Sequence, residues 1–309
     1  MIAQRQVWGE TLLELGATDE RIVLVDGDLA NSTKADLFAA KYPDRFVEVG
    51  IAEQNMVGIA FGLSTLGYRP WLSTFGVFLT HRALDSVRML VSQTRAPVRL
   101  AGAYGGLLNG SSGKTHQDIE DLTIMRAMPS MTVLAPADEY EMRAAVRWAA
   151  EYDGPVYLRI ARDPVSPVFD AGTVWTDWSP RMLRDGDDLT IVSTGVQTTR
   201  CAEAAELLAA RGVHARLVHV PMLKPLDSGH LVDLLGTSRV FTVEEHTKIG
   251  GLGGLVSEIV AECPTRPTVT RLGLADGWSE SGPDSFLLDK YGLSAARIAD
   301  QITQRMLER

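Results

Sequence analysis

Glu53 is the residue whose position raises the first chemical question. It lies in the stretch VEVGIAEQNMVGIAFGLSTLG, residues 47–67, where a strand end leads into an apolar helix. A carboxylate in the first turn of a helix interacts favourably with the helix dipole, by about 0.3–1 kcal/mol. An apolar environment disfavours the charged form of a carboxyl group, which is a common setting for a catalytic acid. The pattern therefore leaves two interpretations open, a structural first-turn acid or a catalytic acid.

Four other side chains are of types that could serve a site. His116 follows a glycine-rich stretch, and a loop histidine is either a functional group or an ordinary solvated one. Phe75 and Phe78 lie at the start of a helical pattern, which by itself favours core residues. Arg162 comes just after an apolar run, where a guanidinium could hold a phosphate or form a surface ion pair. The residue types alone do not decide between these roles.

Short apolar runs alternate with helical patterns over the first half of the chain. The runs lack strict alternation of apolar and polar residues, which is typical of buried parallel strands. They are RIVLVDGD, RFVEV, RPWLSTF, PVRLAG, MTVLAPA and PVYLRIA, with helices expected near 34–41, 53–66, 80–93, 118–127 and 138–150. This βαβ order predicts a mainly parallel sheet flanked by helices.

A second series of the same kind follows a break in the pattern. Residues 163–188 are rich in Pro, Asp and Gly, which indicates a linker. Beyond it we expect the strands LTIVSTG, ARLVHVP, RVFTVEE and TVTRLGL, with helices at 197–211, 227–235, 251–262 and 294–308. The sequence therefore predicts an α/β protein of two domains, 1–165 and 187–309, each with a mainly parallel sheet flanked by helices, joined by a linker at 166–186.

The expected strands point to one edge of the first sheet. In open α/β sheets, ligands bind beyond the carboxyl ends of the strands. The loops near these ends cover 26–33, 50–55, 74–78, 102–116 and 159–163, and they hold most of the unusual polar residues. We therefore expect a site at this edge, with Glu53 as part of it.

Two short motifs suggest nucleotide binding but fail on their context. NGSSGKTHQD contains GKT, yet a phosphate-binding P-loop needs glycine where this chain has Leu108. GGLGGL at 250–255 opens a helix without the strand and acidic residue of a dinucleotide site, so close packing is the better interpretation. No histidine pair has metal-binding spacing, and we expect no metal ligands on this chain.

Composition argues against several classes of protein. Of 309 residues 45% are hydrophobic, the formal net charge is -9, and no basic run stands out, which argues against nucleic acid as a partner. Cys201 and Cys263 have no CxxC companion and are interpreted as ordinary reduced residues. No apolar run is long enough to span a membrane, and the amphipathic start is unlike a signal peptide, so we expect a cytoplasmic protein.

Several segments, taken in order, resemble the transketolase family. They are DGDLANST, YPDRFVEVGIAEQNMVGIA, STFGVFLTHRALDSVRM, GKTHQDIEDLTIMRAMPSMTVLAPAD and VEEHTKIGGLGG, and the match covers essentially the whole chain. The resemblance implies a pyrimidine-binding domain at 1–165 and a transketolase C-terminal domain at 187–309. The diphosphate-binding half of an ordinary transketolase, with its GDG-to-Asn signature for Mg2+, is not in this sequence. The chain therefore resembles the C-terminal subunit of a split transketolase.

The resemblance also implies a cofactor and a partner. The cofactor is thiamine diphosphate with Mg2+, whose metal ligands are expected on an N-terminal transketolase subunit that carries the diphosphate-binding domain. The two subunits are expected to form an α2β2 assembly with the cofactor between them. The implied activity is transfer of a two-carbon ketol unit from a ketose phosphate to an aldose, only in the presence of that partner.

Individual residues carry over from the family because they match its motifs. Glu53 matches the glutamate that contacts N1′ of the thiamine aminopyrimidine, and Phe78, with Phe75 nearby, matches the aromatic wall on that ring. Asp28 matches an acid close to the cofactor, and His116 matches a position that reaches the substrate's reacting oxygens. The residues that match the family's phosphate-binding groups are Arg5, Ser32 and Arg162.

Departures from the family pattern gather on the acceptor side. Ser112 replaces the acid that usually reads the substrate's C2 hydroxyl, and Tyr104 replaces the histidine that usually touches the acceptor phosphate. His81 resembles a one-residue insertion beside the aromatic wall. We therefore expect an unusual anionic sugar as the acceptor.

Two other functions stay open. One is a β-subunit of a 2-oxo-acid decarboxylating enzyme or a synthase that uses pyruvate, although pyruvate has no phosphate for Arg5, Ser32 and Arg162 to hold. The other is a non-catalytic scaffold or regulatory partner subunit, which has no need for a costly buried acid at Glu53.

Overall fold

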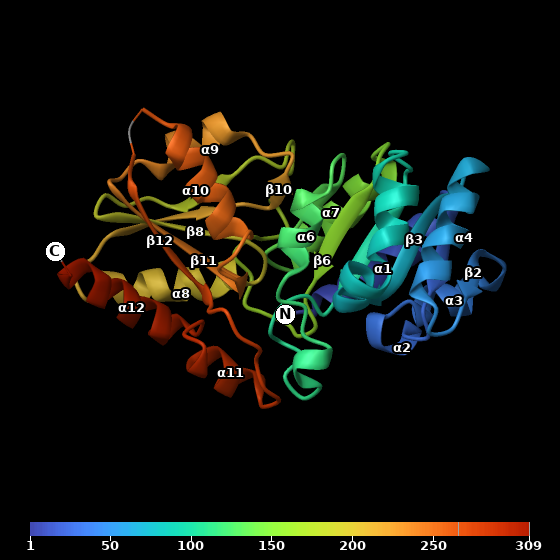
Figure 1. Cartoon of the computed structure of the whole chain (residues 1–309), viewed down its shortest axis with the longest axis horizontal. Helices are drawn as coiled ribbons and strands as arrows, with labels where there is room; N and C mark the ends of the chain where they lie inside the picture. Colours follow the sequence, from blue (N-terminus) through green and yellow to red (C-terminus); the bar gives the residue numbers. More distant parts are fainter. Residues whose placement is uncertain (265, 309) are drawn as a thin grey trace.

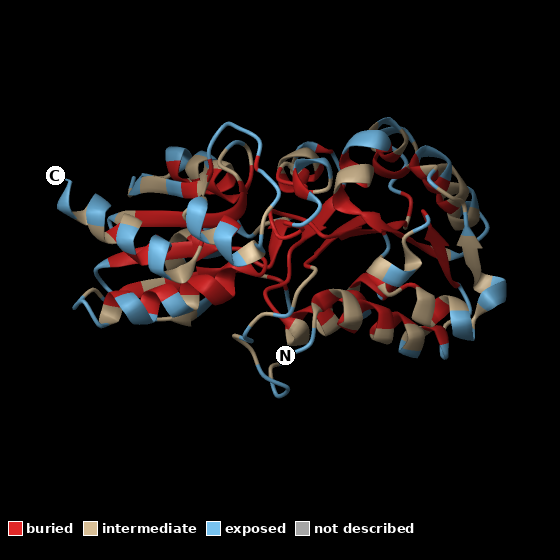
Figure 2. Cartoon of the chain, turned by 90° about the horizontal axis from the view of Figure 1, so that it is seen from below, coloured by how far each residue is buried: buried red, intermediate tan, exposed pale blue. Residues whose placement is uncertain are grey.

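Two sheets flanked by helices lie side by side in the computed structural model, which describes residues 1–264 and 266–308 (Figure 1). Thr265 and Arg309, both within the expected domain at 187–309, lie outside the described residues. Each sheet is mainly parallel, so the predicted α/β fold class is confirmed. Figure 2 shows the central strands buried and the outward faces of the helices exposed. Among the described helices, none is both long and apolar enough to cross a membrane.

The first sheet has the strand order β10-β5-β6-β4-β3-β1-β2. All its pairings are parallel except that of β10 with β5. Every residue of β1, β4, β5 and β6 is buried, which explains why these segments show no alternation in sequence. The strands are β1 (Ile22–Asp26), β2 (Phe46–Glu48), β3 (Arg69–Phe75), β4 (Arg99–Ala103), β5 (Thr132–Leu134), β6 (Val156–Ile160) and β10 (Met222–Lys224).

Helices cover both faces of this sheet. One face packs against α1 (Gln4–Gly16), α3 (Asp36–Lys41) and α7 (Glu139–Glu151), and the other packs against α4 (Glu53–Thr65) and α6 (Asp121–Ala127). A short helix α2 (Ala30–Thr33) follows β1.

The buried residues of α4 explain why a carboxylate lies inside this layer. They are Glu53, Met56, Val57 and Ala60, whose spacing places them on one side of the helix. Because Glu53 occupies the first position of this buried stripe, the fold itself takes its side chain out of water.

The helix expected at 80–93 is interrupted by wider turns. Residues Phe78–Arg82 and Val87–Ser92 are π-helical, with the short α5 (Leu84–Ser86) between them. A π-turn accommodates one extra residue within a helix and often occurs at functional sites. The first π segment contains His81, the residue that resembles an insertion in the sequence.

The second sheet has the order β12-β11-β8-β9-β7 and is parallel except for the pairing of β7 with β9. Helices α8 and α12 pack together on one side of it, while α10 belongs to the core shared with the first sheet. The strands are β7 (Arg181–Arg184), β8 (Leu189–Ser193), β9 (Ala215–His219), β11 (Arg239–Thr247) and β12 (Thr268–Leu274), and the helices are α8 (Gln197–Ala209), α9 (Ser228–Leu235), α10 (Leu252–Glu262), α11 (Asp284–Lys290) and α12 (Ala295–Leu307).

Four α-helices and strands of the structure are absent from the sequence-based expectations, and one of them is the four-residue helix α2. Strand β7 lies inside 166–186, which we expected to be a linker, and its sequence RMLR has too few apolar residues to stand out. Strand β10 has three residues. It belongs to the second half of the chain but pairs with β5 of the first sheet. Helix α11 has seven residues and few buried ones. The domain boundaries at 165 and 187 stay predictions.

Candidate functional site

The expected site residues lie mostly in loops beyond the carboxyl ends of β1, β3, β4 and β6. Asp28 and, within α2, Ser32 follow β1, whereas Tyr104 follows β4 and Arg162 follows β6. Phe75 is the last residue of β3, and Phe78 begins the π-helical segment after it. The four strands are neighbours in the sheet, so the loops meet along one edge. We expected a site at this edge from the sequence, because ligands of open α/β sheets bind beyond the carboxyl ends of the strands.

Glu53 has a charged partner that the sequence analysis missed. Its side chain is 1% exposed, and both carboxylate oxygens accept hydrogen bonds from Nη1 of Arg82 at 2.8 Å. The Arg82 side chain is 45% exposed, and its guanidinium carbon lies 4.3 Å from the centre of the Phe78 ring. We call Glu53, Arg82 and Phe78 the carboxylate corner. A cation one turn after an aromatic residue of the wall was the only signal for Arg82 in the sequence.

Three aromatic rings form a continuous stack beside this corner. The ring centres of Tyr104 and Phe75 are 4.3 Å apart with an interplanar angle of 24°, and those of Phe75 and Phe78 are 5.9 Å apart at 27°. The His116 ring meets Phe75 and Phe78 with its edge, at 6.0 and 5.6 Å between ring centres. Phe75 is buried, whereas Phe78 is half-buried and has part of its ring open. The stack thus joins His116 to the corner around Glu53.

Tyr104 also belongs to a second corner with two arginines. Nη1 of Arg5 donates to the Tyr104 hydroxyl at 2.7 Å and to the carbonyl oxygen of Ser32 at 2.9 Å. Nε of Arg5 donates to the carbonyl oxygen of Arg162 at 3.0 Å, and the Arg162 guanidinium lies 5.7 Å from the Tyr104 ring centre. We call these four residues the arginine corner. The structure therefore brings together the three residues expected to hold a phosphate, and Tyr104 with them.

Asp28 lies at the surface of the site, two residues after Asp26, a buried carboxylate that was not among the expected site residues. Asp28 is exposed and has a φ of 64°, and its backbone N–H donates to Oε1 of Glu48 at 3.0 Å. Below it, Asp26 is buried at the end of β1, where Oδ1 accepts from Leu29 N–H at 2.7 Å and Oδ2 has no partner. Burial raises the pKa of Asp26 to about 6, against the nearby Ser73 hydroxyl and the Leu29 N–H, which lower it.

Residues 105–116 form a loop, the glycine-rich loop, that carries Ser112 and leads to His116. The Ser112 hydroxyl is exposed and donates to Oδ1 of Asn109 at 3.1 Å, so its hydrogen bond stays within the loop. His116 is half-buried, and its Nδ1 lies 2.8 Å from the Thr115 hydroxyl. Ser112 is thus not hydrogen-bonded to the arginine corner, in contrast to Tyr104.

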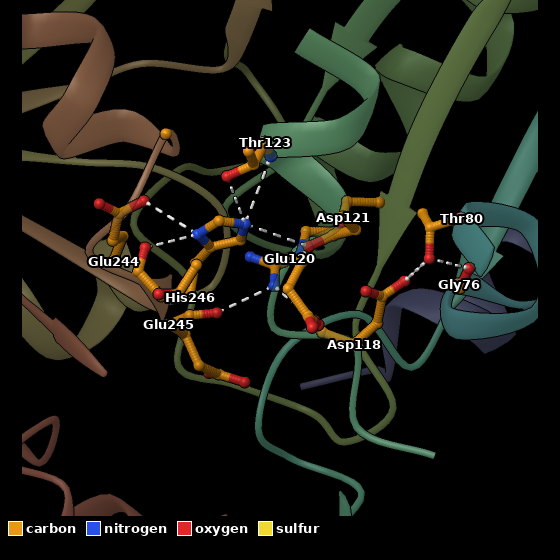
Figure 3. Close-up of polar contacts among 12 residues, drawn as sticks. Gly76, Thr80, Asp118, Glu120, Asp121, Thr123, Glu244, Glu245 and His246 are labelled. Carbon is orange, nitrogen blue, oxygen red and sulfur yellow. Dashed lines mark hydrogen bonds and ion pairs between the residues drawn. The ribbon is translucent and has the colours of Figure 1, made fainter. Parts of the chain in front are cut away.

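A buried polar network links the aromatic wall to the second domain (Figure 3). The Thr80 hydroxyl, in the turn after Phe78, donates to Oδ2 of Asp118 at 2.8 Å. Burial and the nearby Asp121 raise the pKa of Asp118 well above its usual range. Asp121 pairs with Nε of Arg159 at 3.0 Å, and Nη2 of Arg159 donates to the carbonyl oxygen of Glu245 at 2.9 Å. Buried residues of both domains therefore support the segment that carries Phe78.

The two nucleotide-like motifs have structural roles. Gly113–Thr115 form a single 3-10 turn in the glycine-rich loop. In GGLGGL, the N–H groups of Leu252 and Gly253 donate to the Glu244 carboxylate at 2.7 and 2.8 Å. The start of α10 is therefore occupied by an internal carboxylate, in line with the interpretation of close packing.

Two protein-family models match this chain in sequence order. The transketolase pyrimidine binding domain matches residues 1–166, and the transketolase C-terminal domain matches residues 180–298. A solved structure described as "Split gene transketolase, inactive beta4 tetramer" has a TM-score of 0.89 and 42% identity, with 98% of each chain covered.

Similar proteins with known names include transketolase sections or subunits and a synthase. The chain is 38% identical over 306 residues to the putative transketolase C-terminal section of Methanocaldococcus jannaschii, covering 98% of this chain and 96% of that one. It is 35% identical over 306 residues to the 6-deoxy-6-sulfo-D-fructose transketolase subunit of Clostridium sp. (strain MSTE9), covering 97% and 94%. It is 37% identical over 297 residues to the 1-deoxy-D-xylulose-5-phosphate synthase of Heliobacterium modesticaldum, covering 95% of this chain and 46% of that one.

Proposed function

The chain belongs to the transketolase family, and we propose that it is the C-terminal subunit of a split, thiamine-diphosphate-dependent transketolase. The observation that carries this proposal is the carboxylate corner, where a buried carboxylate lies beside a half-open aromatic ring. It supports a cofactor site because both features recognise the same kind of group, a flat ring that offers a proton to a carboxylate.

The position of Arg82 supports this proposal, because its guanidinium group shares several features with the proposed ring. The guanidinium is planar and cationic, lies over the Phe78 ring, and donates to both Glu53 oxygens. An aminopyrimidine ring shares these features once its N1′ carries a proton. Arg82 must give up at least one Glu53 oxygen for that contact, and its half-exposed side chain has solvent to move into.

The residues of this chain then have distinct tasks. Glu53 shares a proton with N1′ of the bound cofactor, while the Phe75 and Phe78 rings hold the aminopyrimidine and exclude water. Asp28 contributes negative charge at the rim, and His116 hydrogen-bonds the substrate's reacting oxygens. Thiamine diphosphate, when bound, supplies the carbon nucleophile that carries a two-carbon ketol unit.

The substrate proposal rests on the arginine corner. Arg5 and Arg162 present two guanidinium groups around Tyr104, and guanidinium pairs well with the oxygens of a phosphate or a sulfonate. We propose a ketose phosphate as the donor and an anionic aldose as the acceptor, bound with Arg5, Ser32, Arg162, Tyr104 and Ser112 near it. The name of the relative from Clostridium, which specifies a sulfo-sugar, supports an unusual anion in place of the ordinary phosphate.

The partner in this proposal is an N-terminal subunit with the diphosphate-binding domain and the Mg2+ ligands, in an α2β2 assembly. The family models matched here are the pyrimidine-binding and C-terminal ones. The similar solved structure is described as inactive when it consists of β subunits, which supports a need for the partner.

Reconstitution with the N-terminal subunit tests the proposal. We expect two-carbon transfer from a ketose phosphate only when both subunits and thiamine diphosphate are present, and none from either subunit alone. Tight thiamine diphosphate binding by this chain alone, measured by calorimetry, would contradict the split site.

A synthase that uses pyruvate is the second candidate. The 37% identity to a 1-deoxy-D-xylulose-5-phosphate synthase favours this candidate. The product named for that enzyme carries a phosphate, which the arginine corner could bind. The same reconstituted complex distinguishes the two: release of CO2 from pyruvate, without ketol transfer from a ketose phosphate, would establish the synthase and refute the transketolase.

A further inference from the structure

The glycine-rich loop is held by a segment of the C-terminal domain, residues 279–284, which we call the bracing segment. The N–H of Gly110 donates to Oδ1 of Asp284 at 3.0 Å, and the N–H of Gly282 donates to the carbonyl oxygen of Gly110 at 2.9 Å. Both backbone polar groups of Gly110 are therefore satisfied by residues far along the chain. A loop tip in this position would otherwise be free to change its conformation.

The two segments approach so closely that only glycine fits at the contact. A Cβ atom at Gly110 would collide with the carbonyl oxygen of Gly282, and one at Gly113 would collide with the Ser281 hydroxyl. Gly113 also has a φ of 73°, which favours glycine. The glycines thus allow the backbone of the loop to pack closely against the bracing segment.

The flanks of the loop are tied to the same domain. Oε1 of Glu245 accepts from the N–H groups of Leu107 and Leu108 at 2.9 and 3.2 Å. The Ser279 hydroxyl donates to Oε1 of Gln117, whose Nε2 donates to the carbonyl oxygen of Leu107 at 3.0 Å. Ser112 and His116 lie between these attachments and keep access to solvent.

We propose that Asp284 fixes the glycine-rich loop and thereby acts as a positioning residue for the acceptor side of the reaction. Asp284 touches neither the aromatic stack nor Glu53 in the described hydrogen bonds and ion pairs, so its effect passes through the loop. The effect on the acceptor rests on the proposed function, whereas the effect on the loop does not. The C-terminal domain, which contributes none of the expected site residues, gains a role in this way.

The surroundings of Asp284 support a link to the arginine corner. The pKa of Asp284 is raised to about 6, first by burial and then by a hydrogen bond with Asp163, while the Gly110 N–H and the charge of Arg162 act in the opposite direction. Asp163 directly follows Arg162, and its Oδ2 lies 3.6 Å from Nη1 of Arg162. Asp284 therefore bonds the loop that carries Ser112 and feels the charge of Arg162, the arginine expected to hold the anion.

Hydrogen–deuterium exchange on the full-length chain tests the bracing contact without any activity. Asp284→Ala removes the acceptor for the Gly110 N–H, and we expect peptides covering 107–116 to exchange about ten-fold faster or more. Asp284→Asn keeps an acceptor oxygen and should remain within about three-fold of the wild type. Peptides from α4 should be unchanged in both variants, which also shows that the chain is folded.

Ser285→Gly is the matched control, because it weakens the start of α11 without removing a contact to the loop. If Asp284→Ala does not fold, Asp284→Ser replaces it, since serine is tolerated at a helix start but its hydroxyl is one bond too short to reach Gly110. Unchanged loop exchange in Asp284→Ala, or an equal rise in Ser285→Gly, would overturn the bracing role.

Kinetics of the reconstituted complex test the consequence for the acceptor. Asp284→Ala should raise the acceptor KM by about ten-fold, with exchange of the cofactor's C2 proton unchanged, and Asp284→Asn should restore the KM. Faster loop exchange with an unchanged acceptor KM would overturn the positioning role. A wild-type complex with no two-carbon transfer would instead refute the proposed function and leave the exchange result standing.

Discussion

The carboxylate corner and the glycine-rich loop lie at the same edge of the first sheet but depend on very different lengths of chain. Glu53 and Arg82 are separated by 29 residues in sequence, whereas Gly110 and Asp284 are separated by 174. The corner is built by α4 and the π-helical segment that follows β3, whereas the glycine-rich loop is bonded to residues of the other domain. In the proposed function, the cofactor side therefore depends on a short stretch of sequence, whereas the acceptor side depends also on a distant segment.

Loss of the acid at Glu53 should have the largest effect on turnover. This effect should be confined to the carboxylate corner and should leave the glycine-rich loop unchanged. Glu53→Gln is nearly isosteric, so we expect the fold to persist and turnover of the reconstituted complex to fall by about 10²–10⁴-fold. The rate of exchange of the cofactor's C2 proton, followed by NMR, measures the step concerned.

Glu20→Gln, the same change at an exposed position, is the control for this experiment. Wild-type proton exchange in Glu53→Gln would return Glu53 to the role of a structural first-turn acid. A change in hydrogen exchange of residues 107–116 in Glu53→Gln would break the separation between the two regions.

A new charge on the glycine-rich loop should have the next largest effect, this time on selectivity. Ser112→Asp restores a charged acceptor for a substrate hydroxyl, and a hydrogen bond to a charged group contributes about 1.5–3 kcal/mol. We therefore expect preference among aldehyde acceptors to move toward common aldose phosphates by about ten- to a hundred-fold in kcat/KM.

Ser111→Asp places the same charge one residue away and is the matched control, because Ser111 is exposed like Ser112. An equal change in both variants would mean that the net charge of the loop matters and that the position of Ser112 does not. A wild-type complex that is most efficient with ribose 5-phosphate, and that loses efficiency in Ser112→Asp, would contradict the proposal for the acceptor.

The buried Asp26, at the end of β1, should make the stability of the chain depend on pH. Its folded-state pKa of about 6 lies above the ordinary 3.8, so the folded chain binds more protons than the unfolded chain between these values. Its contribution to the free energy of unfolding therefore falls as pH rises through about 4 to 6, and the full penalty is present above that range. Asp26→Asn keeps the acceptor for Leu29 and should stabilise the chain by about 1–2 kcal/mol at pH 7, with little change at pH 4. Urea unfolding at the two pH values measures this, and an equal effect at both would contradict it.

Arg82 should give the smallest effect, because water screens its half-exposed side chain. Arg82→Met leaves the buried Glu53 carboxylate without its partner, and we expect the free energy of unfolding to fall by about 1 kcal/mol. The double variant Glu53→Gln/Arg82→Met should recover most of this loss in urea unfolding, since no charge is then left unpaired. Additive losses in the double variant would mean that the two side chains are not coupled.

The same contrast explains what the sequence could predict. The α/β class and most helices follow from apolar periodicity, and the family motif around Glu53 drew attention to the segment that forms the carboxylate corner. Arg82 was missed because its bond to Glu53 joins α4 to a π-helical segment, and regular helical periodicity does not predict the side-chain directions of such a segment. Asp284 was missed because its contact with Gly110 depends on how two domains meet, which periodicity within either domain does not report.

The pairing of β10 with β5 has a consequence for any division of the molecule. Residues 222–224, from the second half of the chain, cover the outer edge of the first sheet through an antiparallel pairing. A fragment that ends at residue 165 leaves the backbone N–H and C=O groups of β5 without this cover. Uncovered strand edges recruit strands from other molecules, which leads to aggregation. The two halves are consequently best regarded as one cooperative folding unit, in which the last strand of the first sheet is added only after residue 224 has been synthesised.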